Sequence, residues 1–189
     1  MSTLRLRLFI FIIVTLSLTG FYEAHADNYP RIWVLVDTKT LTLTVFSGHR
    51  AVARFRNIAL GSGGAAQERW AGDEKTPLGR FRVAWIDWRS RFGVFFGLNY
   101  PTPVEAARAY LQNRISWADY RAIIAAARAH RIPPQNTPLG GQIGIHGLGA
   151  GNPVVQSDIN WTDGCIALSN RQIKSLALWV HIGTEVIIR

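Results

Sequence analysis

Residues 32–36 read Ile-Trp-Val-Leu-Val and residues 41–46 read Leu-Thr-Leu-Thr-Val-Phe, and side-chain types alternate along both segments. Side chains that alternate with a period of two face opposite sides of a β-strand, so both segments are predicted to be strands. A turn at residues 47–49 and a third apolar segment at residues 51–60 follow directly. The pattern therefore predicts a β-meander.

Further strand signals follow after a glycine-rich loop at residues 61–64. This loop lacks the spacing and the following helix of a phosphate-binding loop, so we interpret it as an ordinary connection. Residues 76–79, Thr-Pro-Leu-Gly, predict a turn that leads into another strand. The later predicted strands lie at residues 80–86, 94–98, 142–146 and 184–188.

Three helices are predicted from their capping residues and apolar stripes. Thr102 and Glu105 form a capping box before residues 106–111, and Ser116 precedes a striped segment that stops at Pro133. Ser169 caps a third helix, whose apolar stripe extends to Val180. The first two helices interrupt the strand order at residues 101–141, so we expect a helical insertion there. The fold class is α+β, mainly β with helices.

The first 26 residues have the pattern of an export signal. A basic start precedes an apolar run at residues 8–18, and residues 24–26, Ala-His-Ala, form a small-x-small cleavage site. We therefore expect a signal peptide at 1–26, one domain at 27–189, no stable membrane insertion after cleavage, and a periplasmic or cell-wall location. The apolar run is shorter than the roughly 20 residues of a membrane span; an uncleaved anchor is the alternative.

The mature chain is basic. Removing Arg5, Arg7 and Glu23 from the 21 Lys+Arg and 12 Asp+Glu leaves 19 and 11, a net charge of +8. This charge favours anionic partners, but the basic residues are scattered along the sequence. For an exported protein we expect cell-wall carboxylates or anionic lipid surfaces as partners and no nucleic acid. A merely solubilising surface charge is the alternative.

Cys165 is the only cysteine, and it lies in the segment 161–168, Trp-Thr-Asp-Gly-Cys-Ile-Ala-Leu. It cannot form an intramolecular disulfide, and an idle free thiol is a liability in an oxidising compartment. Its position directly after Gly164 lets backbone amides approach the sulfur. We therefore interpret Cys165 as a functional thiol.

A functional thiol needs a base. A free cysteine has a pKa of about 8.5, so only a small fraction of it is the reactive thiolate at neutral pH. Among five histidines, His146 stands out because it ends the strand segment 143–145 and opens a glycine-rich loop at residues 147–151. Strand ends that continue into loops often present catalytic side chains. We pair Cys165 with His146, while a buried cysteine beside a structural histidine is the alternative that the residues alone leave open.

The neighbouring residues limit the possible chemistry. Asp163 would raise the pKa of Cys165 if its carboxylate lay close to the sulfur, or it could hold the loop or bind a substrate amine. One cysteine and scattered histidines lack the paired spacing of zinc sites, so no metal and no cofactor are expected. A papain-like protease is disfavoured because its cysteine precedes its histidine in the chain.

These residues resemble the L,D-transpeptidases with a YkuD-type catalytic domain. The family pattern is His-Gly, then Ser/Thr-x-Gly-Cys-Ile/Val and a downstream Asn, and it matches His146-Gly147, residues 162–166 and Asn170. Residues 76–81, Thr-Pro-Leu-Gly-Arg-Phe, resemble the family's Thr-Pro-x-Gly-x-Phe turn and strand. The resemblance implies a YkuD-like β-sandwich with the two-helix insertion and one helix after the catalytic cysteine.

The resemblance also implies a mechanism on peptidoglycan stem peptides. Cys165 would attack the carbonyl of the L-centre of diaminopimelate in a tetrapeptide stem, expel D-alanine and form a thioester. His146, its ring held by the carbonyl of Gly147, would transfer the proton, and the N–H groups of Gly164 and Cys165 would bind the oxyanion. The resemblance gives three further residues a loop-bracing or substrate-binding role: Thr162, Asp163 and Asn170.

The outcome of the reaction depends on what resolves the thioester. A second stem or an envelope protein as acyl acceptor would give cross-linking or protein anchoring, and water would give hydrolysis. Many relatives have histidine at the position of Asp163 and arginine at Ala167, and relatives with similar departures include enzymes that cleave links to peptidoglycan. An amidase or hydrolase of the same fold and a non-catalytic wall-binding module are therefore the alternatives.

Overall fold

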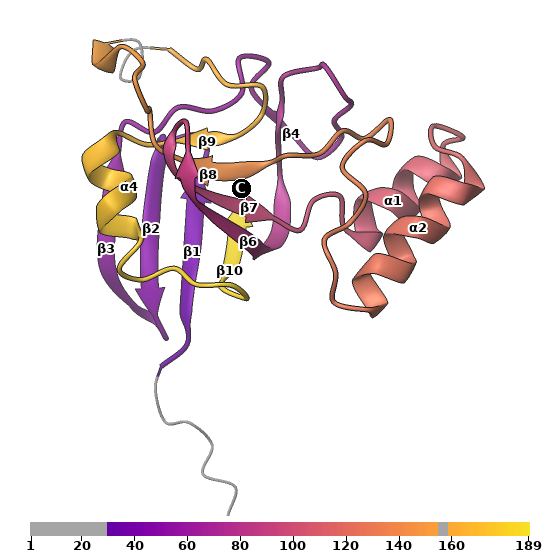
Figure 1. Cartoon of the computed structure of the whole chain (residues 1–189), viewed down its shortest axis with the longest axis horizontal. Coiled ribbons are helices and arrows are strands. Elements are labelled where there is room, and N and C mark those ends of the chain that lie inside the picture. Colours follow the sequence, from indigo (N-terminus) through magenta and orange to yellow (C-terminus); the bar gives the residue numbers. More distant parts are fainter. Residues whose placement is uncertain (1–29, 155–158) are drawn as a thin grey trace, which may run out of the picture.

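The computed structural model describes residues 30–154 and 159–189, so the predicted signal peptide at 1–26 lies outside the described residues. Eight strands form one curled sheet in the order β3-β2-β1-β10-β6-β7-β8-β9, and β4 pairs with β5 separately (Figure 1). The strands are β1 (Ile32–Asp37), β2 (Thr42–Ser47), β3 (Arg50–Arg56), β4 (Ala65–Ala66), β5 (Thr76–Pro77), β6 (Gly79–Ser90), β7 (Gly93–Leu98), β8 (Gly144–His146), β9 (Ile166–Ala167) and β10 (Glu185–Ile188). The predicted α+β class is confirmed.

The first three strands form the predicted meander. β1 pairs antiparallel with β2, and β2 with β3, while the other edge of β1 pairs in parallel with β10. Val34 and Val45 are register partners and both are fully buried, because the period-two pattern turns them to the same face. On the other face, the register partners Trp33 and Phe46 stack with ring centroids 4.3 Å apart.

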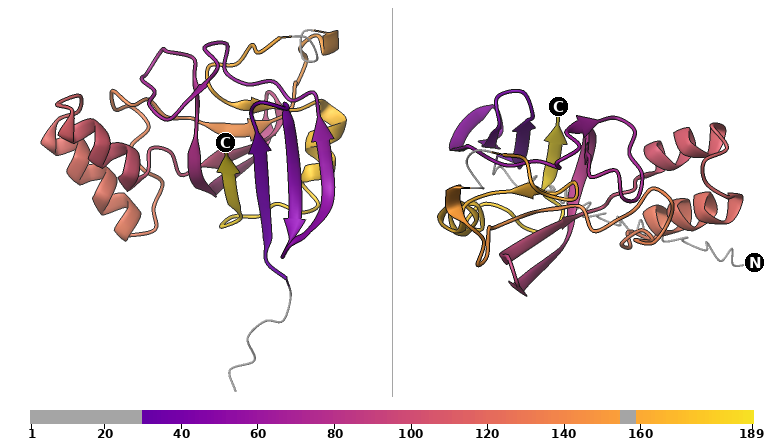
Figure 2. Two further views of the ribbon diagram at one scale, coloured as in Figure 1. Left: turned by 180° about the vertical axis from the view of Figure 1, so that it is seen from behind. Right: turned by 90° about the horizontal axis from the view of Figure 1, so that it is seen from above.

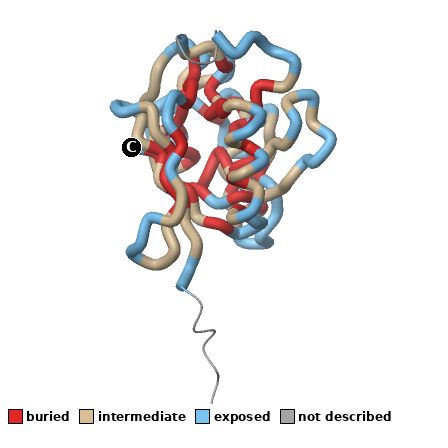
Figure 3. The backbone as a smooth tube through the Cα atoms, turned by 90° about the vertical axis from the view of Figure 1, so that its left-hand side faces the viewer, coloured by how far each residue is buried: buried red, intermediate tan, exposed pale blue. Residues whose placement is uncertain are grey.

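Strand β6 joins the two halves of the sheet. Its first residues, Gly79–Arg82, pair with β10, and its later residues pair with β7. The sheet bends along this long strand, so that β7, β8 and β9 turn away from the β1–β3 meander (Figure 2). Buried segments lie in the interior and exposed segments surround them (Figure 3). Phe81, Ile145 and Val186, from β6, β8 and β10, are at most 1% exposed. The arrangement matches the expected sandwich.

The boundary of β3 differs from the prediction. The apolar pattern predicts a strand up to Leu60, but β3 ends at Arg56 because Asn57 adopts a left-handed conformation with φ 56°. The chain then turns to lie beside β9, where Ala59 and Ala167 exchange both backbone hydrogen bonds at 2.9 and 2.8 Å. The end of the predicted strand therefore supports the cysteine segment instead of the meander.

The helices begin at the predicted capping boxes. They are α1 (Pro103–Leu111), α2 (Trp117–Arg128) and α4 (Asn170–Leu176), and α4 ends four residues before the predicted Val180. Thr102, Ser116 and Ser169 each accept a hydrogen bond from a backbone N–H of the first turn. The insertion with α1 and α2 lies on one side of the sheet and α4 on the other (Figure 1). None of the described helices has the length and hydrophobicity of a membrane span.

Candidate active site

The pairing of β8 with β9 brings Cys165 and His146 together. The two short strands run in parallel, with Ile145 opposite Ile166 and His146 opposite Ala167. Cys165 directly precedes β9, two residues before the partner of His146. Side chains two residues apart on a strand point to the same face, so this register directs Cys165 and His146 to one side of the sheet.

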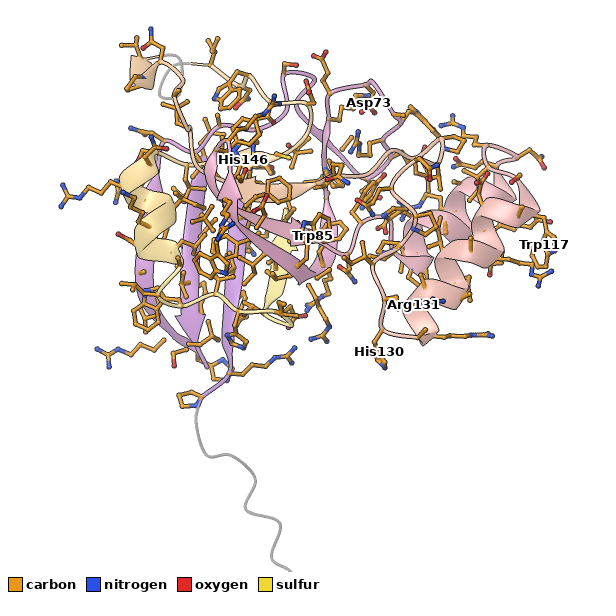
Figure 4. All side chains as sticks on the ribbon, in the orientation of Figure 1. Asp73, Trp85, Trp117, His130, Arg131 and His146 are labelled. Atoms are coloured by element: carbon orange, nitrogen blue, oxygen red, sulfur yellow. The ribbon has the colours of Figure 1, made fainter. Side chains whose placement is uncertain are left out.

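Both residues line a cleft of about 920 Å³. The β6–β7 hairpin forms one wall with Trp85, Arg91 and Phe92, and Figure 4 shows Trp85 and His146 on this part of the sheet. The remaining walls come from the segment 161–165, from residues 140–142 at the end of the insertion, and from lining residues within the segment 69–74. The cleft is large enough for a peptide chain.

Aromatic rings enclose the His146 imidazole. Phe92 stacks on it with centroids 4.3 Å apart, Phe95 lies 5.9 Å away in a nearly parallel plane, and Trp161 meets it edge-on. The residue is only 2% exposed. Its Nδ1 lies 2.7 Å from the carbonyl oxygen of Gly147. A carbonyl oxygen can only accept a hydrogen bond, so Nδ1 carries the proton of the neutral ring. The unprotonated Nε2 is then free to take up a proton.

This environment keeps His146 neutral. Burial lowers the pKa of the imidazole, and the Arg91 guanidinium lowers it further, while the hydrogen bond to Gly147 acts in the opposite direction. The imidazole is therefore uncharged at neutral pH, as a general base requires.

The Cys165 thiol is held on the side of β8. The residue is partly exposed, and its thiol donates to the carbonyl oxygen of Gln142 at 3.3 Å. Burial raises the pKa of Cys165 to about 11, against the lowering effects of the Gly144 backbone N–H and Arg69, and Asp163 raises it further. The resting thiol is thus protonated and donates its hydrogen bond to the carbonyl oxygen of Gln142.

Thr162 and Gly164 shape the turn before the cysteine. The buried Thr162 hydroxyl donates to the carbonyl of Cys165 at 2.7 Å and accepts from the N–H of Gly164 at 3.2 Å. Gly164 has φ 118°, and a Cβ there would lie 2.6 Å from the carbonyl oxygen of Lys75. Glycine is therefore required here. The N–H of Gly164, an expected oxyanion donor, is already engaged by Thr162.

Asn170 and Asp163 occupy different environments. The Asn170 side chain accepts from the N–H of Gly149 at 2.8 Å and donates to its carbonyl at 2.7 Å, so it braces the loop after His146. Asp163 is exposed and lines the cleft beside Cys165. Of the residues expected to brace or bind substrate, Asp163 and Thr162 line the cleft, whereas Asn170 is not among the described residues that line it.

The segments around Gly61 and Thr76 support the cysteine turn, a role that the sequence does not predict. A Cβ on Gly61 would lie 2.0 Å from the carbonyl oxygen of Glu74 and 3.0 Å from the Cα of Gly164. The fully buried Thr76 accepts the N–H of Gly61 at 2.9 Å. The glycine loop, which the sequence predicts only as an ordinary connection, and the Thr-Pro turn therefore pack together against the cysteine turn.

The described residues of α1 and α2 do not line the cleft, and of the described insertion residues only Gly140 and Gly141 do. Figure 4 shows Trp117 on the outer side of the insertion, away from His146. In the described part of the chain, no three His, Cys, Asp or Glu side chains are grouped to hold a metal ion.

Comparison with known proteins identifies the family. Residues 31–188 match the YkuD family model, the L,D-transpeptidase catalytic domain, so the chain belongs to this family. No curated protein matches the sequence significantly.

The fold is similar to that of two bacterial proteins. The helical cell shape determining protein Pgp2 from Campylobacter jejuni has a TM-score of 0.59 and 20% identity, over 85% of this chain and 49% of that chain. Bd1075 from Bdellovibrio bacteriovorus has a TM-score of 0.54 and 18% identity, over 87% of this chain and 50% of that chain. The present chain thus spans about half the length of either protein, and the likeness concerns the fold.

Replacing Gly164 with alanine is expected to disturb the cysteine turn. Gly164→Ala should destabilise the protein by more than Gly64→Ala, since both glycines have positive φ but only Gly164 has backbone atoms in the way. A left-handed alanine alone costs about 1–2 kcal/mol. Urea unfolding of both variants measures the difference, and equal losses would contradict a close-packed cysteine turn.

The alkylation of Cys165 by iodoacetamide is expected to rise with pH to a midpoint near 11. A raised pKa means that the folded state retains the thiol proton, and alkylation requires the thiolate. In guanidinium the same thiol should titrate near pH ~8.5, which provides the control. A folded-state midpoint below that of the unfolded chain would show a preformed thiolate and imidazolium pair instead.

Proposed function

We propose that this protein is an exported cell-wall L,D-transpeptidase that acts through a thioester on Cys165. The observation that carries the proposal is the shared cleft of a lone cysteine and a buried, neutral histidine at the ends of neighbouring parallel strands. Membership of the L,D-transpeptidase family supports the same reaction class. The substrates are peptidoglycan stem peptides.

The first step joins Cys165 to the donor peptide. The thiol turns from Gln142 toward Nε2 of His146, which takes the proton as the sulfur attacks the carbonyl of the L-centre of diaminopimelate. A C–S bond forms, the C–N bond to D-alanine breaks, and His146 returns the proton to the leaving amine. The hydrogen bond from Nδ1 to Gly147 keeps the ring oriented throughout.

Backbone amides stabilise the negative charge of the tetrahedral intermediate. The N–H of Cys165 is the proposed primary donor, because the N–H of Gly164 must first leave the Thr162 hydroxyl. Losing one oxyanion donor typically costs roughly 3 kcal/mol of transition-state stabilisation. The Thr162 hydroxyl holds the turn that carries Gly164 and Cys165. Asp163 lines the cleft, where its carboxylate is placed to bind an approaching amine.

The second step releases the acyl group without a cofactor. The thioester retains much of the energy of the broken amide, so the amine of a second stem or of an envelope protein resolves it without ATP. Water resolves it to a free tripeptide in the hydrolase alternative. The predicted signal peptide at 1–26 places the reaction in the periplasm or cell wall, with the domain at 27–189 as the catalytic unit.

Incubation with a disaccharide-tetrapeptide is expected to release D-alanine and give a cross-linked dimer, detected by mass spectrometry. Cys165→Ala should abolish both products, because it removes the nucleophile, while Asn170→Ala, which alters only loop bracing, should retain measurable turnover. Tripeptide without dimer would assign the protein as a hydrolase. Binding of the peptide without any D-alanine release by the wild type would leave only a wall-binding module.

A further inference from the structure

Arg69 is a buried cation in the wall of the cleft that the mechanism above does not use. It lines the same cleft as Cys165 and His146. The residue is only 4% exposed, and its guanidinium lies 5.3 Å from the centre of the Tyr100 ring. Arginine is rarely buried to this extent unless it is fully paired or has a ligand.

The pairing of Arg69 is incomplete. Nη2 donates to the carbonyl oxygen of Trp70 at 3.0 Å, and Nε lies 3.5 Å from Oδ1 of Asp73 in an ion pair. Among the described residues, however, Nε and Nη1 find no hydrogen-bond acceptor. The Asp73 carboxylate is occupied by the backbone N–H groups of Trp70 and Lys75, at 2.8 and 3.0 Å. Buried donors without acceptors cost free energy, so an anion at this position would be stabilised.

The cleft wall next to Arg69 lacks bulky side chains. Ala71, Gly72, Gly140 and Gly141 all line the cleft. A Cβ on Gly140 would lie 3.3 Å from Nη2 of Arg69, so even one methyl group there would crowd the guanidinium. The positive charge of Arg69 also lowers the pKa of Cys165, against the larger raising effect of burial. A peptide bound at the thiol is therefore within the electrostatic reach of this cation.

We propose that Arg69 binds a free carboxylate of the donor peptide and thereby selects stems with that carboxylate near the scissile amide. This assignment rests on the proposed function, in which a stem peptide is the donor. The planar guanidinium suits a carboxylate because two parallel N–H groups can donate to its two oxygens. Nε and Nη1 are buried in the free protein, so binding includes a shift of this side chain toward the cleft.

The two residues joined by the scissile amide each carry one free carboxylate. One is the C-terminal carboxylate of D-alanine, and the other is on the D-centre of diaminopimelate. The experiment therefore compares three peptides: the free tetrapeptide, its C-terminal carboxamide and its diaminopimelate carboxamide. Calorimetric titration into the Cys165→Ala protein measures binding without turnover.

One of the two amides is expected to bind about tenfold or more weakly than the free tetrapeptide, as for the loss of a charged hydrogen bond. Arg69→Met in the same background should remove this preference, and Arg69→Lys should retain part of it. Arg108→Met is the matched control. Arg108 lines the adjoining small pocket with Arg69 but is not among the described residues that line the cleft, so the preference should persist.

The possible results separate this assignment from the proposed function. Equal binding of all three peptides to the Cys165→Ala protein, or an unchanged preference in a folded Arg69→Met variant, would overturn the role of Arg69 alone. The peptide comparison does not depend on the variant, so it decides the question even if Arg69→Met fails to fold in thermal unfolding. Absence of binding by every stem peptide would overturn both.

Discussion

The parallel pairing of β8 with β9 is the constraint on which the site depends. This pairing is only two residues long, with Ile145 opposite Ile166 and His146 opposite Ala167, yet it sets the register of the histidine against the cysteine. A slip by one residue would turn one of these side chains to the opposite face. The antiparallel exchange between Ala59 and Ala167 holds the outer edge of β9, so neither edge of this short strand is left open.

Close backbone approach then determines where the sulfur lies. Gly61, Gly164 and Thr76 let three segments distant in sequence meet behind the cysteine, and the Thr162 hydroxyl closes the turn in front of it. The same packing removes much of the water around the partly exposed thiol and raises the pKa of Cys165 to about 11. The site therefore keeps Cys165 protonated at rest, and in the proposed mechanism the neutral His146 removes this proton.

The sequence predicts the strands and helices well where the pattern is local. Period-two alternation predicted β1 and β2, and the capping residues predicted the start of all three described helices. It placed the end of β3 too late, because the left-handed Asn57 redirects the apolar segment, and it missed β9, which is too short to show a period. The motif predicted Cys165 and His146 as a pair. The role proposed for Arg69 rests on contacts between segments distant in sequence, which no local pattern encodes.

Acid-quenched mass spectrometry can establish whether His146 generates the nucleophile at Cys165. A rapid quench of the protein with tetrapeptide donor, followed by peptide mapping, should find a tripeptidyl thioester on Cys165. In a folded His146→Gln variant its formation should slow by on the order of 10²–10⁴. An adduct elsewhere, or equal rates in the two proteins, would contradict the account.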